Sequence, residues 1–162
     1  MKSCHHAKNK GYFISWLLTS IMILTACSHQ KQNEKSISFS NNTWQRYDIL
    51  KFEFPLSGSK ESYDLLFELR CSKTFAFNEL PLNMILYTPS GEERIRECHL
   101  QIKETNGSFK GSFKGDTVIT RLVLKKELYC SVKGVLKIEI ENLNPRMQTE
   151  GVFSASTILI KN

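Results

Sequence analysis

The chain has 162 residues, of which 41% are hydrophobic and 23% charged, with 8 Gly and 4 Pro. This length fits one domain with a tail, and the composition excludes a fibrous repeat or a wholly disordered chain. The formal net charge is +6, but three of the 22 basic residues (Lys2, Lys8 and Lys10) lie in a segment that we expect to be removed. The remaining 19 basic residues face 16 acidic ones, a net charge of +3 with no polybasic run, which argues against nucleic-acid binding.

The amino-terminal segment has the pattern of a lipoprotein signal peptide. After the basic start, residues 11–26 form a mostly apolar run, shorter than the roughly 20 residues of a membrane-spanning helix. The run ends in Leu24-Thr25-Ala26-Cys27, which resembles the bacterial lipobox, where cleavage precedes a cysteine that carries lipid. We therefore predict a signal peptide over residues 1–26 and attachment of lipid, palmitate included, at Cys27, which leaves a mature chain of 136 residues (162 minus 26).

Residues 27–43 are predicted to form a lipidated, flexible tether. The stretch after Cys27 is rich in Ser, Asn, Gln and Lys, and only Ile37 and Phe39 in it are apolar. Such a composition buries too little surface to order itself. No acidic residue directly follows Cys27, where some lipoproteins carry sorting signals, so we expect the protein to face the periplasm.

Residues 44–162 are predicted to form one all-β domain. Short segments with period-two alternation are separated by turn signals, and in residues 63–71 the side chains of Tyr63, Leu65, Phe67 and Leu69 share one face. Seven such segments predict an antiparallel β-sandwich of jelly-roll or Ig-like type, with a barrel as the alternative. They are residues 44–54, 63–71, 80–87, 94–102, 118–124, 134–141 and 151–160.

Glycines mark the predicted turns. Residues 88–91 read Thr-Pro-Ser-Gly and predict a type II turn, and Asn106-Gly107 is typical of a hairpin. Residues 107–115 form a small tandem, GSFKGSFKG, that lacks the Lys-Ser/Thr ending of a phosphate-binding loop. We expect a tight turn or bulge there, with Phe109 and Phe113 packed nearby.

The sequence predicts no catalytic residue, metal site or cofactor site, and hence no enzyme. Only His29 and His99 remain after cleavage, so a two-histidine metal site within the domain is excluded. Cys98 and His99 are neighbours on a strand and point to opposite faces, which argues against a dyad. The acids Asp48, Asp64 and Asp116 are expected on solvent faces.

Three cysteines and a group of aromatic residues leave alternatives open. Cys71, Cys98 and Cys130 are expected to be buried thiols, with one disulfide between two of them as the alternative. Alternation places Phe52, Phe54, Tyr63 and Phe67 in the core. Phe75 and Phe77 lie in a turn-like stretch and are candidates for a ligand-binding platform.

Taken in order, several of these features resemble the GldH-type gliding-motility lipoproteins of Gram-negative bacteria. Phe109 stands where that family's glycine turn usually carries Trp. The resemblance implies a non-catalytic β-sandwich lipoprotein that serves as an accessory part of the gliding or associated secretion apparatus. The features are the lipobox at Cys27, Trp44, the segment 63–70, Leu80 with its strand, Pro89-Ser90-Gly91 and residues 107–111.

The sequence therefore leaves three possible functions. The first is a lipid-anchored envelope protein with protein partners, acting in assembly of that apparatus. The alternative is a lipid-anchored binding module for glycan or another small ligand, which an exposed aromatic row at Phe75 and Phe77 would support. The third is a hydrolase, which needs two titratable groups within hydrogen-bond reach in a cleft.

Overall fold

The computed structural model describes residues 32–58 and 60–162, so the predicted signal peptide, Cys27 and His29 lie outside the described residues. Within these ranges no helix is long and apolar enough to cross a membrane. The regular structure is a short 3-10 turn, η2 (Ser40–Asn42), and strands. The strands are β1 (Gln32–Ser38), β2 (Thr43–Gln45), β3 (Leu50–Leu56), β4 (Ser62–Ser72), β5 (Glu79–Tyr87), β6 (Glu93–Gln101), β7 (Ser112–Lys114), β8 (Thr117–Tyr129), β9 (Gly134–Asn142), β10 (Gln148–Glu150) and β11 (Val152–Lys161).

Period-two alternation along the long strands builds the core. In β3, for example, the side chains alternate without a break between buried and exposed positions. Because successive side chains of a strand point to opposite faces, each sheet turns one apolar face inward. The four aromatic residues predicted for the core, Phe52, Phe54, Tyr63 and Phe67, are all buried.

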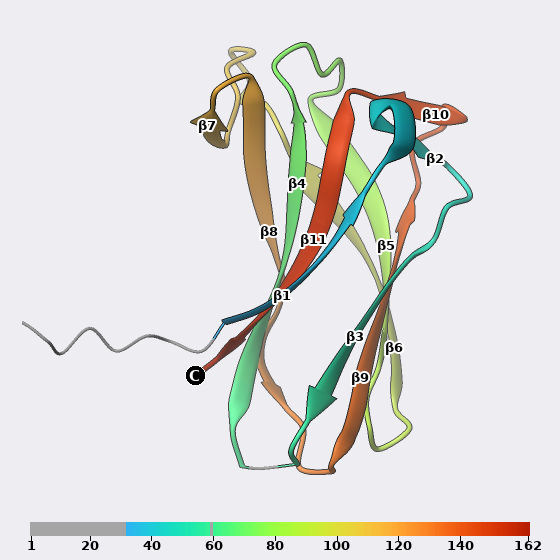
Figure 1. Ribbon diagram of the computed structural model, residues 1–162, viewed down its shortest axis with the longest axis vertical. Helices are drawn as coiled ribbons and strands as arrows, with labels where there is room; N and C mark the ends of the chain where they lie inside the picture. The colour runs from blue at the N-terminus through green and yellow to red at the C-terminus, as the bar shows by residue number, and fades with distance from the viewer. Residues whose placement is uncertain (1–31, 59) are drawn as a thin grey trace, which may run out of the picture.

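The long strands pair as nested antiparallel partners, which identifies a jelly roll (Figure 1). The first pairs with the last (β1 with β11), and inside this pair lie β3 with β9, β4 with β8, and β5 with β6. The resulting sheets have the orders β1-β11-β4-β8-β7 and β3-β9-β5-β6, and a two-stranded ribbon joins β10 to β2. This confirms the predicted sandwich and selects the jelly-roll over the Ig-like alternative, whose first sheet takes the first, second, fifth and fourth strands.

The domain begins earlier in the chain than the sequence indicated. The prediction of a flexible tether through residue 43 was wrong for Gln32–Ser38, because these residues form β1 and pair along their whole length with β11. Nearly all β1 side chains are exposed, so the strand has no hydrophobic alternation to reveal it. Backbone pairing to β11 holds it, and Ile37 packs against the core. The five residue steps from Cys27 to Gln32 span at most about 18 Å.

The strand register defines two ends of the sandwich. Gln32 lies opposite Ile160, and Ile160 lies opposite Asp64, at the end that we call the base. Ser72 pairs with Thr117 at the other end, eight residue steps or about 27 Å further along β4. Figure 1 shows the β2–β10 ribbon and β7 at this second end, which we call the ribbon end.

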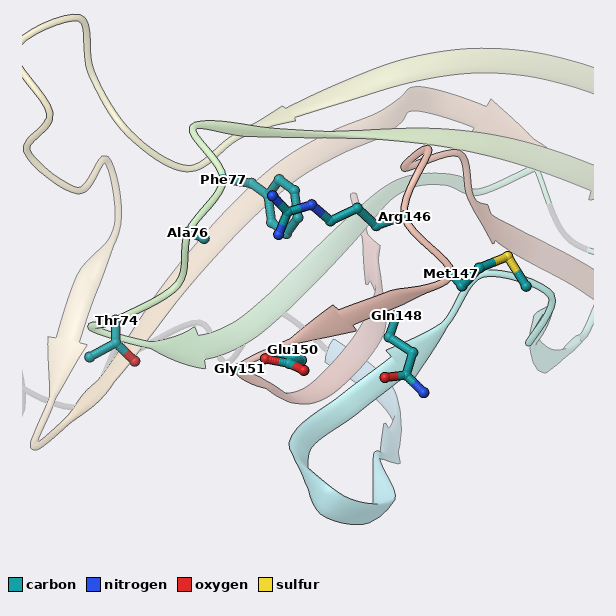
Figure 2. Close-up of a pocket in the computed structure, with 8 residues that line it drawn as sticks. All are labelled: Thr74, Ala76, Phe77, Arg146, Met147, Gln148, Glu150 and Gly151. Carbon is teal, nitrogen blue, oxygen red and sulfur yellow. The ribbon is translucent and has the colours of Figure 1, made fainter.

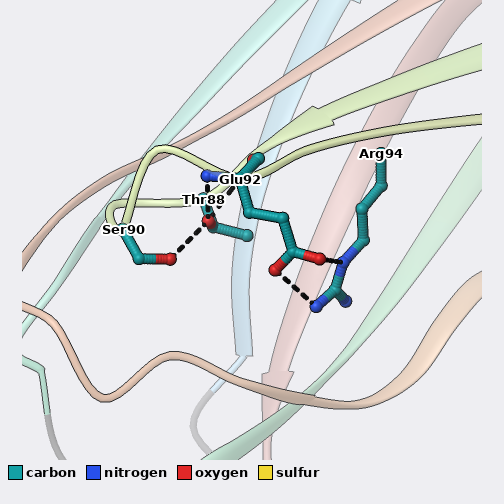
Figure 3. Close-up of polar contacts among 4 residues, drawn as sticks. All are labelled: Thr88, Ser90, Glu92 and Arg94. Carbon is teal, nitrogen blue, oxygen red and sulfur yellow. Dashed lines mark hydrogen bonds and ion pairs between the residues drawn. The ribbon is translucent and has the colours of Figure 1, made fainter.

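The turn between β5 and β6 differs from the type II turn that the sequence predicts (Figure 3). The Gly91 amide donates to the Thr88 carbonyl over 3.0 Å, so Gly91 is the fourth residue of the turn. Gly91 has a φ of 86°, whereas Ser90 lacks the positive φ that a type II turn needs at its third position. The arrangement fits a type I turn followed by a left-handed glycine, and Asn106-Gly107 repeats it, with the Gly107 amide bonded to the Glu104 carbonyl.

Side chains also hold this turn in place. The Thr88 hydroxyl accepts a hydrogen bond from the Glu92 amide over 3.1 Å and lies 2.8 Å from the Ser90 hydroxyl. The Arg94 guanidinium donates through two nitrogens to the Glu92 carboxylate, over 2.6 and 2.7 Å (Figure 3). This bidentate contact lowers the pKa of Glu92. The loop from β5 to β6 is therefore cross-linked by hydrogen bonds.

Candidate functional site

The β2–β10 ribbon is fixed to the core by one aromatic side chain. Trp44, on β2, is fully buried, and its ring stacks on Phe39 with the centroids 5.4 Å apart. Its indole nitrogen donates to the Asp48 carbonyl over 2.9 Å. On β10 the buried Thr149 hydroxyl accepts a hydrogen bond from the Asn142 amide nitrogen over 2.8 Å. Each strand of the ribbon is thus fixed to the core through one buried, hydrogen-bonded side chain.

The outer side of the ribbon end exposes large apolar side chains. Tyr47 is 74% exposed and Met147 56%, and the Arg46 amide donates to the Met147 carbonyl over 2.9 Å, which joins their two loops. Ile49 is also exposed and follows in the same loop as Tyr47. We call Tyr47, Ile49 and Met147 the ribbon patch. Tyr and Met are enriched in protein–protein interfaces, so two of the three patch residues are of types common at docking surfaces.

A cavity of about 480 Å³ lies on one side of the ribbon, between β10 and the loop from β4 to β5 (Figure 2). Figure 2 shows the Arg146 side chain extended over the Phe77 ring, and the guanidinium carbon lies 5.2 Å from the ring centroid. Gln148 and Glu150 line the same cavity from β10. The cavity therefore combines a cation, a carboxylate and an amide with one half-buried aromatic ring.

The predicted aromatic platform is only half present. Phe75 is 2% exposed and belongs to the core, where it packs against Phe77 with the ring centroids 5.4 Å apart. Phe77 alone reaches the cavity. Only one ring of the predicted pair thus lines the cavity, and the Arg146 side chain lies over it.

A second cavity, of about 620 Å³, lies on the other side of the ribbon. Its lining includes Ile37, Phe39 and Asn41, and the exposed Tyr47 and Ile49. Asn41 has a φ of 55°, a left-handed conformation that asparagine adopts more readily than most residues. The ribbon patch is therefore bordered by a cavity on each side.

The three cysteines of the domain are buried, and none of them forms a disulfide within the described residues. Burial raises the pKa of the Cys71 thiol to about 11, and it also raises the pKa of Cys98 and of Cys130. A thiolate is the reactive form of cysteine, so burial suppresses the chemistry that a nucleophile needs. The thiols pack as small apolar side chains.

The titratable residues singled out in the sequence lie apart. His99 is half-exposed between Glu79 and Glu97, at 3.5 and 3.7 Å, whereas Cys98 is buried on the opposite face, as predicted. Asp64 accepts hydrogen bonds from the Glu127 amide and the Asn162 side chain, which lower its pKa. In residues 32–58 and 60–162 no group of three His, Cys, Asp or Glu side chains could hold a metal ion.

Comparison with known proteins identifies the family. The family model described as GldH lipoprotein matches residues 31–155. The chain belongs to the GldH lipoprotein family. One relative, the gliding motility lipoprotein GldH of Flavobacterium johnsoniae, is 25% identical over 134 residues, which cover 83% of this chain and 80% of the relative. The GldH resemblance proposed from the sequence is thus confirmed, and the chain is a lipoprotein of the cell envelope.

Two solved structures of a virus also align with this GldH-family chain. They are the VP2 subviral particle of infectious bursal disease virus, with 14% identity and a TM-score of 0.36, and the Gx strain of that virus, with 11% and 0.35. Each alignment covers 81% of this chain but only 32% of the viral chain, so this chain spans about a third of the length of those proteins. Similarity at this level carries no functional argument.

The ribbon patch and Arg146 were not found from the sequence of this GldH-family chain. The ribbon pairs Thr43 with Glu150, residues far apart in the chain, through strands of three residues that are too short to show a period. The available signal was compositional: Tyr47 and Ile49 stand in a polar stretch between Trp44 and Leu50, outside the alternation of the next strand. Alternation alone cannot place such a loop.

Proposed function

We propose that this GldH-family chain is a non-catalytic accessory or assembly component of gliding-motility or associated secretion machinery, held at the membrane by lipid on Cys27. The name of the relative, a gliding motility lipoprotein, supports the association with gliding motility. The observation that carries the assembly role is the ribbon patch, where three exposed apolar side chains lie in the loops beside the ribbon, between two cavities. Such a surface fits a protein partner in the envelope.

The position of the patch suits this role. Lipid on Cys27 would hold Gln32, at the base, within about 18 Å of the attachment point. The ribbon end lies about 27 Å further along the strands, so it lies away from the membrane that this lipid would anchor. We propose that this arrangement presents the patch to partners in the periplasm.

Crosslinking in cells tests the assembly role. We expect the full chain to co-purify with stable envelope partners after mild crosslinking, and the double variant Tyr47→Ala/Met147→Ala to lose most of them, because exposed apolar anchors carry much of the binding energy at interfaces. The matched control is Tyr129→Ala, which removes a side chain 66% exposed at the base. A chain that always purifies alone, or a loss that is equal in the control, contradicts the proposal.

The Phe77–Arg146 cavity favours a second function, a binding module for a glycan or other small ligand. Its volume of about 480 Å³ falls in the range of small-molecule sites, and Arg146, Gln148 and Glu150 offer hydrogen-bond donors and acceptors. In a thermal-shift screen of sugars and sugar acids, we expect a ligand that stabilises the full chain to lose its effect in Arg146→Ala. A screen in which no sugar raises the melting temperature contradicts this second function.

A further inference from the structure

The glycine-rich tandem of residues 107–115 forms a basic and aromatic surface at the ribbon end. Four lysines meet there from three segments of the chain: Lys73 from the loop after β4, Lys103 and Lys110 from the loop after β6, and Lys114 from β7. Lys73 lies beside Phe113 and Lys103 beside Phe109, whereas Lys114 follows Phe113 on β7 and points to the opposite face of the sheet. We call these six residues the lysine–phenylalanine knob. Figure 1 shows β7 and its loop beside the ends of β4 and β8.

Backbone contacts hold the knob in one shape. Lys103 and Phe109 form an antiparallel bridge, and the Lys110 amide donates to the Ile102 carbonyl over 2.8 Å. Gly111 lies so close to β8 that a Cβ atom there would overlap the Ile119 carbonyl oxygen. Gly111 therefore lets the loop pack directly on the sheet, which places the backbone of Phe109 and Phe113 before any ligand arrives.

The two rings and two of the ammonium groups make direct contacts. The Phe109 and Phe113 rings meet edge to face, with the centroids 6.2 Å apart and the planes at 89°. The Lys103 ammonium nitrogen lies 5.2 Å from the Phe109 centroid, and the Lys73 nitrogen lies 5.9 Å from the Phe113 centroid. Phe113 is still 56% exposed. An aromatic surface open to solvent thus stands beside fixed positive charge.

The knob has more positive than negative charge. Of its two neighbouring acids, Asp116 lies 3.3 Å from the Lys73 nitrogen, and Glu104 lies 3.9 Å from the Lys110 nitrogen. Lys103 and Lys114 form no ion pair with any acid of the described residues. Lys103 lies beside the rings, and Lys73 has only an exposed pair with Asp116, so these two ammonium groups can meet an anionic ligand.

We propose that the knob binds an anionic polysaccharide. Lys73 and Lys103 pair with its carboxylate groups, and the apolar face of a sugar ring stacks on Phe113. A lipid surface fits less well, because the knob lies at the ribbon end, away from the base that follows Cys27. An acidic peptide would use the lysines but would not need the exposed ring. This site goes beyond the proposed function and shares no residue with the ribbon patch. Either proposal can therefore be contradicted by its own test without affecting the other.

Binding of polygalacturonate, a polymer of uronic acid sugars, tests the proposal. The full chain is purified in detergent, and its affinity for the immobilised polymer is measured. We expect binding that weakens as salt rises, because exposed charge pairs are screened. Lys73→Gln/Lys103→Gln should reduce affinity about 3- to 10-fold, as expected for two exposed ion pairs, and Phe113→Ala should reduce it about threefold.

The controls separate this ligand from the other polyanions. Lys126→Gln/Lys133→Gln removes two exposed lysines near the base and should leave affinity unchanged, and neutral dextran should not bind. Circular dichroism melting must show that each variant folds as the parent does. Absence of polygalacturonate binding at low salt overturns the proposal. So does binding of polyglutamate or of phosphatidylglycerol vesicles that is at least as tight and indifferent to Phe113→Ala.

Discussion

Glu68 shows how a single residue can depart from the rule of its strand. It lies on the outer face of β4, as alternation predicts, yet its side chain is only 1% exposed. The Arg70 and Arg121 guanidinium groups donate to its two carboxylate oxygens over 2.8 and 2.7 Å and cover them from solvent. Arg70 also lies 3.8 Å from Glu34 on β1, so the four charges extend across the five-stranded sheet.

Removing the Glu68 charge should therefore destabilise the domain. We expect Glu68→Gln to lower the free energy of unfolding by about 1–3 kcal/mol, because the buried amide keeps one acceptor oxygen but turns its NH2 group toward the second guanidinium. Urea unfolding of the full chain measures the change. Glu53→Gln, which breaks an exposed pair with Lys137, should cost less than about 0.5 kcal/mol. Equal losses of unfolding free energy in the two variants would contradict a stabilising role of the buried Glu68 carboxylate.

At the scale of single elements, the pairing of β7 with β8 depends on Gly111. Its backbone passes directly against the Ile119 carbonyl, which belongs to β8 and cannot move without disturbing the ladder to β4. We expect Gly111→Ala to cost about 1–3 kcal/mol of stability and to expose β7 and its neighbours. Hydrogen exchange should then speed up in residues 112–119 and remain slow in β4. Ser112→Ala, at an exposed neighbouring position, is the control, and protection of β7 that survives in Gly111→Ala contradicts this reading.

The elements also show what the sequence could and could not predict. Where a strand has one face in the core, as β3 and β4 have, the buried and exposed positions can be predicted residue by residue. β1, by contrast, is polar along almost its whole length and depends on pairing with β11, more than 100 residues away. β2, β7 and β10 have three residues each and show no period. The candidate site at the ribbon end is made of two of these short strands, β2 and β10, and of the loops beside them, so most of it could not be predicted.

The nested strand pairing gives the whole molecule two different ends. Because β1 pairs with the last strand, the start of the described chain and its C-terminus lie together near the base (Figure 1). The ribbon patch and the lysine–phenylalanine knob both lie at the opposite end. With β1 part of the domain, at most about 18 Å of chain separates Cys27 from Gln32, far less than a tether through residue 43 would allow. Lipid at Cys27 would therefore hold the base close to the membrane.

Energy transfer in vesicles tests this orientation. A single new cysteine is introduced at Tyr129, near the base, or at Tyr47, in the ribbon patch, two positions of similar exposure. The native Cys71, Cys98 and Cys130 are buried with raised pKa values, so a thiol-reactive donor dye labels the new site preferentially. With the lipidated chain in vesicles whose headgroups carry an acceptor, we expect strong transfer from position 129 and weak transfer from position 47.

The Cys27→Ala variant supplies the control for the anchor itself. It should lose palmitate labelling and precursor processing in cells. The unanchored control for energy transfer is the chain from Ser28 to Asn162, which carries neither the lipid nor the apolar run and should show no transfer from either dye position. Equal transfer from both positions in the lipidated chain would mean that the domain lies on its side. Stronger transfer from position 47 would place the ribbon end against the lipid. Either result would leave the ribbon patch unable to face partners away from the membrane, so the measurement bears directly on the assembly role.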